Sequence, residues 1–137
     1  IVKRIESANG EVVKENSPVL VRQTVTASTS KYLRKYLENT VELGTAHKAY
    51  IEGYSIAGKT GTAQENQDKP NHALFIGYAP YDTPEIAMAV RITNGYSSTN
   101  AASVAKDIVS YYFKLKDESD IITNTAANVN VSNSFAD

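Results

Sequence analysis

The sequence predicts an α+β fold in which helices pack against an antiparallel β-sheet. Three strand-like runs follow one another within residues 54–93, and the segments between them are short. A parallel crossover needs a dozen or more residues, so short connections favour antiparallel neighbours. One helical pattern precedes these runs and another follows them. With 137 residues and 42% apolar side chains, the chain is long enough for one domain with a hydrophobic core.

The first thirteen residues are predicted to form a β-hairpin. Two β-rich runs flank Asn9-Gly10, the dipeptide that best tolerates the positive φ angles of a tight turn. Pro18 then breaks the chain. The hairpin is therefore expected to end before Pro18.

Residues 28–44 are predicted to form the first helix. Its apolar face consists of residues that recur four apart: Leu33, Leu37 and Val41. Ser28 or Thr29 is expected to cap the start of this helix, and Gly44 is expected to end it.

Residues 54–63, 72–79 and 85–93 are predicted to be the three strands. The last of them alternates, with Ile86, Met88, Val90 and Ile92 on one side and Ala87, Ala89 and Arg91 on the other. The polar link 64–71 contains a proline and is expected to be a loop. His72 opens the second strand. We interpret it as a strand-end histidine with a local partner, in preference to a wall residue of a substrate cleft.

Residues 101–115 are predicted to form the last helix. Its expected buried stripe consists of large apolar residues: Val104, Ile108, Tyr111, Tyr112 and Leu115. After Leu115 the sequence becomes polar, rich in Asn and Ser, and loses any sustained period. The chain is therefore expected to divide into a folded part, residues 1–115, and a solvated, disordered tail, residues 116–137.

Composition excludes several classes of function. A net charge of -1 with interspersed signs does not indicate a nucleic-acid partner. The absence of cysteine excludes disulfides, thiol nucleophiles and thiolate metal sites. The two histidines, His47 and His72, lack metal-ligand spacing, so no metal or other cofactor is expected. No apolar run reaches the about 18 residues of a membrane span. The chain starts at Ile1 without a methionine or charged leader, which indicates a piece of something longer.

One stretch matches the phosphate-binding loop of nucleotide hydrolases. Gly53, four residues, and then Gly58-Lys59-Thr60 fit G-x-x-x-x-G-K-[ST]. Such a loop needs a buried strand before it and a helix directly after it, because the helix N-terminus holds the phosphates. Here the preceding residues are half polar, and Gly61-Thr62 leads into a polar loop. Nucleotide binding is therefore not expected.

The same stretch contains Lys59-Thr60-Gly61. K-T-G, together with S-x-x-K and S-x-N, is typical of serine β-lactamases and penicillin-binding proteins. Four blocks carry the match further, in the right order and at the right distances: residues 57–64, 72–80, 84–95 and 101–113. Together they resemble the C-terminal part of the transpeptidase domain of a class B penicillin-binding protein, and "VELGTA" resembles the segment upstream of the K-T-G strand. The resemblance covers about residues 1–113.

This resemblance implies acyl transfer at a D-alanyl-D-alanine stem peptide of peptidoglycan, or at a β-lactam that imitates it. Lys59 would supply a positive charge near the substrate carboxylate and near the proton-relay serine. The hydroxyls of Thr60 and Thr62 would bind the carboxylate, and Gly61 would let substrate lie against the strand. The backbone N–H of Thr62 would be one of two donors of the oxyanion hole.

The family's nucleophile is a serine in S-x-x-K, and a second serine stands in S-x-N. Ser28-x-x-Lys31 fits the first pattern but lies only about thirty residues before Lys59, whereas the family's nucleophile lies far upstream. The triplets at 7–9 and 98–100 fit the second pattern, but neither completes the family order with Ser28. Turn and cap duties explain all three, so the nucleophile is expected in a missing N-terminal portion.

Other members of the superfamily leave alternatives open. A β-lactamase or a D,D-carboxypeptidase shares the fold and the K-T-G strand, and a non-catalytic module of this fold would bind a β-lactam or cell-wall peptide without turnover. The resemblance implies a parent on the bacterial cell surface, outside the cytoplasmic membrane and anchored by an N-terminal helix. The remainder of that parent is an expected partner, and the sheet face that meets it is expected to be apolar. The isolated chain is expected to be inactive.

Overall fold

A computed structural model describes residues 2–123 of the chain, which forms two compact units: the residues up to Ser30 and those from Lys31 onward. The first unit contains the predicted hairpin, in which β1 (Arg4–Glu6) pairs antiparallel with β2 (Val12–Glu15). Gly10 adopts the positive φ of 85°, and its N–H donates to the carbonyl of Ser7 at 2.9 Å. The hairpin prediction is therefore confirmed, with Gly10 as the residue that requires positive φ.

Helix α1 (Ala27–Glu42) forms where the first helix was predicted. Its cap was predicted wrongly, because the hydroxyl of Thr26 accepts the N–H of Thr29 at 3.1 Å, and Ser28 and Thr29 lie inside the first turn. The predicted apolar face is only partly correct. Val41 is buried in the core, but Leu33 is exposed. The inward-facing stripe runs through Glu38 and Val41 instead, so Leu33 lies to one side of it.

The sheet consists of β3 (Ala57–Ala63), β4 (His72–Ala79) and β5 (Ile86–Ile92) in the order β3-β4-β5. Both pairings are antiparallel, as the short connections predicted. The predicted alternation of β5 is also confirmed, since its isoleucine, methionine and valine side chains pack against the core while the alternate residues are exposed.

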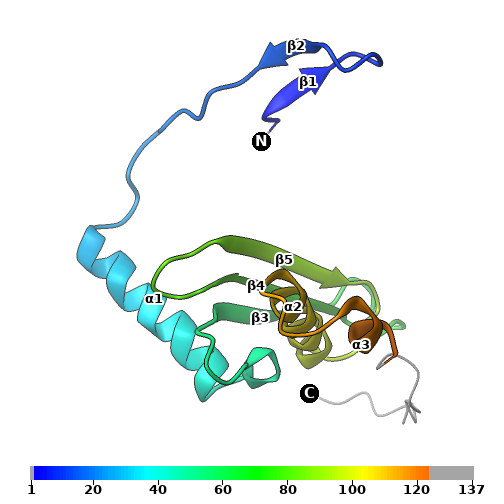
Figure 1. Cartoon of the computed structure of the whole chain (residues 1–137). Helices are drawn as coiled ribbons and strands as arrows, with labels where there is room; N and C mark the ends of the chain where they lie inside the picture. Colours follow the sequence, from blue (N-terminus) through cyan, green and yellow to red (C-terminus); the bar gives the residue numbers. More distant parts are fainter. Residues whose placement is uncertain (1, 124–137) are drawn as a thin grey trace. The chain divides into compact units, whose positions relative to one another are not determined.

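Helix α2 (Ser98–Tyr112) lies across one face of this sheet (Figure 1) and also contacts the short 3-10 helix η1 (His47–Ala49). The hydroxyl of Ser97 caps it by accepting the N–H of Thr99 at 3.3 Å. The predicted buried stripe is wrong, since Val104, Tyr111, Tyr112 and Leu115 are exposed. The buried face consists of smaller residues: Ala101, Ala102, Ala105, Val109 and Ser110. Small side chains let the helix backbone approach the sheet closely, where the ring of Phe75 fills the space.

A further helix, α3 (Glu118–Thr123), forms within the segment predicted to be a disordered tail and contacts α2. The expectation is therefore wrong for these residues. Glu118 and Asp120 lie in the first turn, where negative charge is favourable. The rest of that segment, residues 124–137, lies outside the described residues. Within residues 2–123 no helix has the length and apolar character needed to cross a membrane.

Candidate functional site at the edge of the sheet

The residues singled out by the sequence lie in β3. Among the described residues β3 pairs only with β4, so its other edge has no neighbouring strand. The carbonyl of Gly58 accepts the hydroxyl of Thr40, and the carbonyl of Thr60 accepts the Lys59 ammonium at 2.9 Å. In an antiparallel pair the backbone groups of alternate residues point to the partner strand or away from it. The N–H of Thr62 therefore points to the free edge, like the backbone groups of Gly58 and Thr60.

The Lys59 ammonium lies over this edge. Besides the carbonyl of Thr60, its Nζ lies 3.4 Å from the Thr60 hydroxyl. Lys59 is exposed and forms no ion pair with any residue in the range 2–123. Its charge is thus available to an anionic group that approaches the edge of β3.

Thr60 has a second hydroxyl neighbour that sequence reasoning missed. The oxygen atoms of Thr45 and Thr60 lie 3.2 Å apart, and Thr60 is only 8% exposed while Thr45 is exposed. A hydroxyl has two acceptor lone pairs and one proton. If Lys59 and Thr45 both donate to Thr60, the Thr60 proton is left for an external acceptor such as a carboxylate. The only signal in the sequence was the resemblance of the "VELGTA" segment, which contains Thr45. No role could be given to Thr45 from the sequence, because only the turn after α1 brings it to β3.

Side chains from α1 hold β3 and the β4–β5 connection. The hydroxyl of Thr40 lies within hydrogen-bonding reach of the carbonyls of Gly58 and Leu37, and its single proton can be donated to either of them. The guanidinium of Arg34 donates to the carbonyl of Tyr81 at 2.5 Å and lies 5.3 Å from the centre of its ring. A hydrogen bond to the Tyr78 hydroxyl raises the pKa of Arg34. These contacts position the start of β3 and the end of β4 relative to α1.

Two glycines face each other across β3 and β4, because Gly58 pairs with Gly77. A methyl group at Gly58 would lie 2.3 Å from Phe75 Cζ, and one at Gly77 would lie 2.7 Å from the carbonyl oxygen of Ala57. The pair therefore leaves room for the buried ring of Phe75. Glycine directly before Lys59 serves packing, whereas Gly61 lies one residue beyond Thr60 with only the side chain of Leu74 nearby.

His72 has the local partner that the sequence predicted. It pairs across the ladder with Ala63, and the residue is 5% exposed. Its Nε2 lies 2.6 Å from a carboxylate oxygen of Glu65, and its Nδ1 accepts the backbone N–H of Asn94 at 3.0 Å. His72 therefore connects the loop after β3 with the turn after β5.

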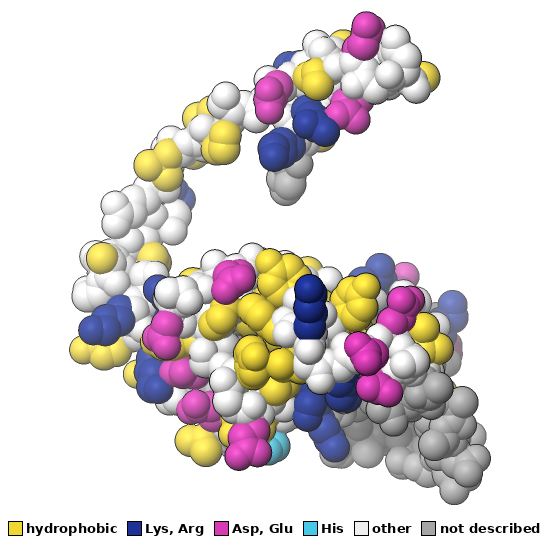
Figure 2. Space-filling model, viewed as in Figure 1, with side chains coloured by type: hydrophobic (Ala, Val, Ile, Leu, Met, Phe, Trp, Pro, Cys, Tyr) yellow, Lys and Arg dark blue, Asp and Glu magenta, His cyan; other side chains and the backbone are white. Residues whose placement is uncertain are grey.

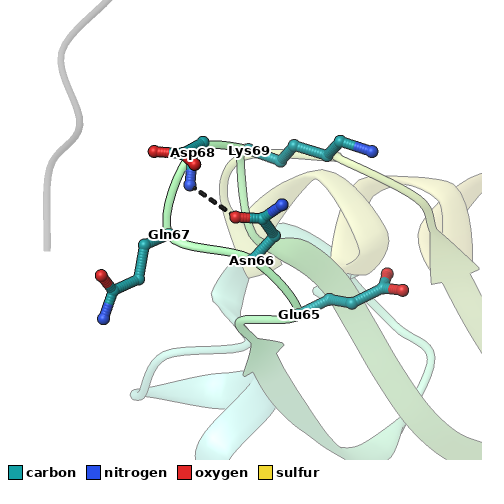
Figure 3. Close-up of a pocket in the computed structure, with 5 residues that line it drawn as sticks. All are labelled: Glu65, Asn66, Gln67, Asp68 and Lys69. Atoms are coloured by element: carbon teal, nitrogen blue, oxygen red, sulfur yellow. Dashed lines mark hydrogen bonds between the residues drawn. The ribbon is translucent and has the colours of Figure 1, made fainter.

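The loop between β3 and β4 carries an open depression lined by five consecutive side chains, residues 65–69 (Figure 3). The backbone N–H of Asp68 donates to the side-chain oxygen of Asn66 at 2.9 Å. The side chains of Gln67 and Lys69 point in different directions (Figure 3). Because the polar groups do not converge on one point, this depression is a loop surface and not a built binding site.

Of the three serine matches, only the one at residues 7–9 has the turn role that the sequence predicted. The cap role expected of the other two is wrong, because Thr26 and Ser97 cap α1 and α2. Ser28 lies in the first turn of α1, and its hydroxyl is 2.9 Å from that of Thr26. Ser7 lies in the hairpin turn and donates to the carbonyl of Glu11 at 3.2 Å. In the third pattern, Asn100 donates its amide to the carbonyl of Gly95 at 2.8 Å at the start of α2.

The phosphate-loop match has no matching geometry. Gly58, Lys59 and Thr60 lie inside β3, and the strand continues to Ala63 instead of giving way to a helix. The free N–H groups of a helix N-terminus are therefore not positioned at this motif. Among residues 2–123 no three His, Asp or Glu side chains are grouped as a metal site would require.

Comparison with known proteins identifies the family. The family profile described as penicillin binding protein transpeptidase domain matches residues 1–110. The chain belongs to the penicillin-binding protein transpeptidase family. The fold agrees, since the antiparallel sheet with packed helices superimposes on solved transpeptidase domains, as the sequence predicted.

Three relatives illustrate the match. The chain is 36% identical over 115 residues to stage V sporulation protein D of Bacillus subtilis (77% of this chain, 18% of the relative). It is 33% identical over 103 residues to the peptidoglycan D,D-transpeptidase MrdA of Acinetobacter baumannii (65% and 15%). The D,D-transpeptidase domain of a peptidoglycan glycosyltransferase from Eggerthella lenta aligns with a TM-score of 0.63 and 30% identity (82% of this chain, 27% of that domain chain). The chain therefore spans less than a fifth of the first two relatives.

Proposed function

We propose that this chain is one part of a peptidoglycan D,D-transpeptidase that supplies the K-T-G strand and the oxyanion side of the active site. One observation carries the proposal. The Lys59 ammonium, the Thr60 hydroxyl and the outward-facing N–H of Thr62 lie together along the edge of β3 that has no neighbouring strand in the described chain. The name of the Acinetobacter baumannii relative supports this class of reaction.

Four consecutive residues of β3, from Lys59 to Thr62, have roles in this proposal. Lys59 attracts the substrate carboxylate and sits near the proton-relay serine, while the hydroxyls of Thr60 and Thr62 bind that carboxylate. Gly61 has no side chain, so the peptide can lie directly against the strand at this position. The N–H of Thr62 donates to the oxyanion that forms when the carbonyl is attacked, and such a donor is worth about 3–4 kcal/mol of transition-state stabilisation.

The substrate is expected to be an extended stem peptide ending in D-alanyl-D-alanine, or a β-lactam that imitates it. A serine oxygen attacks the carbonyl of the penultimate residue, the terminal D-alanine leaves with a proton, and an amine of a second stem peptide then takes the acyl group. An edge strand suits this substrate because its unpaired backbone groups can pair with a peptide. No cofactor is needed for this chemistry, and neither a nucleotide nor a nucleic acid takes part in it.

The nucleophilic serine is proposed to lie in another portion of the parent protein. Ser28, the serine in S-x-x-K, occupies the first turn of α1 beside the hydroxyl of Thr26. The effects of catalytic residues that act as a unit are strongly non-additive, so a chain with half of the site should not turn over.

That remainder is also the proposed partner. On the sheet face opposite α2, the register places apolar side chains from β4 and β5 side by side: Leu74, Ile76, Tyr78, Ala87 and Ala89. Ile76 is 63% exposed. Figure 2 shows one view of this unit, in which hydrophobic side chains gather among polar and charged residues. An exposed apolar surface of this kind is typical of an interface.

We place the parent on the bacterial cell surface, outside the cytoplasmic membrane, held there by an N-terminal membrane helix.

The proposal is tested by acylation with a fluorescent penicillin. A protein that joins this chain to the serine-bearing portion should gain one penicilloyl group, measured by intact mass, and the 137-residue chain alone should gain none. Lys59→Ala should slow acylation by about 10- to 100-fold, because a charged hydrogen bond to the carboxylate is lost. Lys48→Ala, in η1, is the matched control and should react at the unchanged rate. An adduct on Ser28 of the isolated chain would overturn the proposal.

A further inference from the structure

His72 is a buried titratable residue that the proposed reaction does not use. Its side chain is 7% exposed and contacts two segments other than its own strand. Glu65, whose side chain is 74% exposed, approaches Nε2 from the loop after β3, and Asn94 approaches Nδ1 from the turn after β5. A buried ring with a partner on each nitrogen is held in one orientation.

Elementary chemistry determines the tautomer of this ring. The backbone N–H of Asn94 can only donate, so Nδ1 of His72 must accept and cannot carry a proton. The ring proton then lies on Nε2, where it is donated to the Glu65 carboxylate at 2.6 Å. The ring is too buried to exchange a proton with a substrate, so any effect of His72 on catalysis acts through the chain segments it holds.

The hydrogen bond between Glu65 and His72 lies just beyond the end of β3. His72 and Ala63 are the last pair of the β3–β4 ladder. Glu65 follows Ala63 by two residues, and Thr62 precedes it by one. Since β3 has a neighbour on one side only among the described residues, its end is free to fray unless something beyond the ladder holds it. The Glu65–His72 hydrogen bond is placed to do so.

We propose that His72 is a positioning residue for the oxyanion-side strand. With its Nε2 proton donated to Glu65 and its Nδ1 bound to the N–H of Asn94, it anchors the chain just beyond Thr62 and so keeps the Thr62 N–H aimed at the free edge. This inference rests on the proposed function, in which that N–H stabilises the oxyanion. It does not depend on any contact between His72 and substrate.

The first test uses nuclear magnetic resonance on the 137-residue chain, with the histidine rings labelled with ¹⁵N. We expect an unprotonated Nδ1 and a protonated Nε2 for His72 at neutral pH, with the Nε2 proton visible because exchange is slow. The opposite tautomer, or a doubly protonated ring at that pH, would overturn the assignment. His47 is an internal reference with the opposite tautomer. Its Nδ1 lies 2.9 Å from the carbonyl of Glu42, and since a carbonyl only accepts hydrogen bonds, this Nδ1 must carry the proton.

The second test measures acylation by penicillin in the protein that joins this chain to the serine-bearing portion. Glu65 is the residue to change, because its exposed side chain can be altered without opening the core. Glu65→Ala removes the acceptor and should lower the limiting acylation rate constant about 5-fold, with little change in penicillin binding. Glu65→Gln keeps an acceptor oxygen and should restore most of the rate. Asp68→Ala, which removes a carboxylate from the same loop, should react like wild type.

The outcomes are distinguishable. If the wild-type protein is not acylated, the proposed function fails, and the resonance test alone decides whether His72 holds Glu65 and Asn94 as described. If the wild-type protein is acylated but all three variants react alike, the positioning role is refuted. A fall in penicillin binding with an unchanged limiting rate would also contradict it, because the oxyanion donor acts in the transition state.

Discussion

Replacing Gly58 with alanine is expected to destabilise the chain, whereas the same replacement at Gly61 in the same strand is not. A methyl group at Gly58 would lie 2.3 Å from Phe75 Cζ and 2.8 Å from the carbonyl oxygen of Ile76. The ring is fully buried and the carbonyl belongs to β4, so neither can yield without displacing core neighbours. A methyl group at Gly61 would lie 3.3 Å from Leu74 Cβ, which a shift of a few tenths of an ångström relieves.

Two opposing effects determine the size of the change. Alanine is about 0.5–1 kcal/mol more favourable than glycine inside a strand, because the unfolded chain has less freedom to lose. Forcing a methyl group into a filled core costs about 1–3 kcal/mol. For Gly58→Ala the clash is severe, so the net loss should be about 1–2 kcal/mol, or about 3–8 °C in Tm for a domain of this size. For Gly61→Ala the two effects should cancel to within about 0.5 kcal/mol.

Thermal and urea unfolding of the whole chain, followed by circular dichroism, measures both variants against wild type. If both variants lose the same free energy of unfolding, any side chain added to β3 is destabilising, and the clash with the Phe75 ring does not explain the loss at Gly58. A Gly58→Ala variant as stable as wild type would show that the ring does not lie over Gly58.

Three further changes have expected outcomes. Ser97→Ala removes the cap of α2 and should lower the free energy of unfolding by about 1 kcal/mol, measured by urea unfolding, while Ser97→Asp should not. Thr40→Val removes the hydroxyl donated to the carbonyl of Gly58 and should also cost about 1 kcal/mol, whereas Thr40→Ser should cost less. Thr45→Val should leave Tm unchanged but slow acylation by carboxylate-bearing β-lactams about 2- to 10-fold in the joined protein, because the Thr60 hydroxyl loses a neighbour that orients it.

Local patterns in the sequence predicted most elements of the fold. The hairpin turn at Gly10, the three strands and both long helices follow from turn residues and from periods of two or about four residues, which depend only on neighbours along the chain. The antiparallel order of β3, β4 and β5 followed from short connections. The K-T-G strand was found by its resemblance to a family. The site assigned to four of its residues, Lys59 to Thr62, remains a proposal.

Burial was harder to predict than secondary structure. The expected stripe of α2 was chosen by side-chain size, but the helix buries its alanines and exposes Tyr111 at 57% and Val104 at 39%. Which face of a helix is buried depends on the shape of the surface it meets, and here a sheet with a large ring in its centre accepts only a helix with small side chains. The cap of α1 also differs from the prediction. Thr26, and not Ser28, lies where the first free N–H groups of α1 emerge, and its hydroxyl accepts one of them.

The sequence by itself determined most of the elements, the antiparallel order of the sheet and the strand that carries Lys59 and its neighbours, because these are properties of short segments. Only the tertiary structure decided which backbone groups of β3 face its free edge. It also brought Thr45 to the hydroxyl of Thr60 and joined Glu65, His72 and Asn94 around one imidazole ring. Those contacts link residues 7 to 22 positions apart through turns and strand pairing, and no local period in the sequence records them.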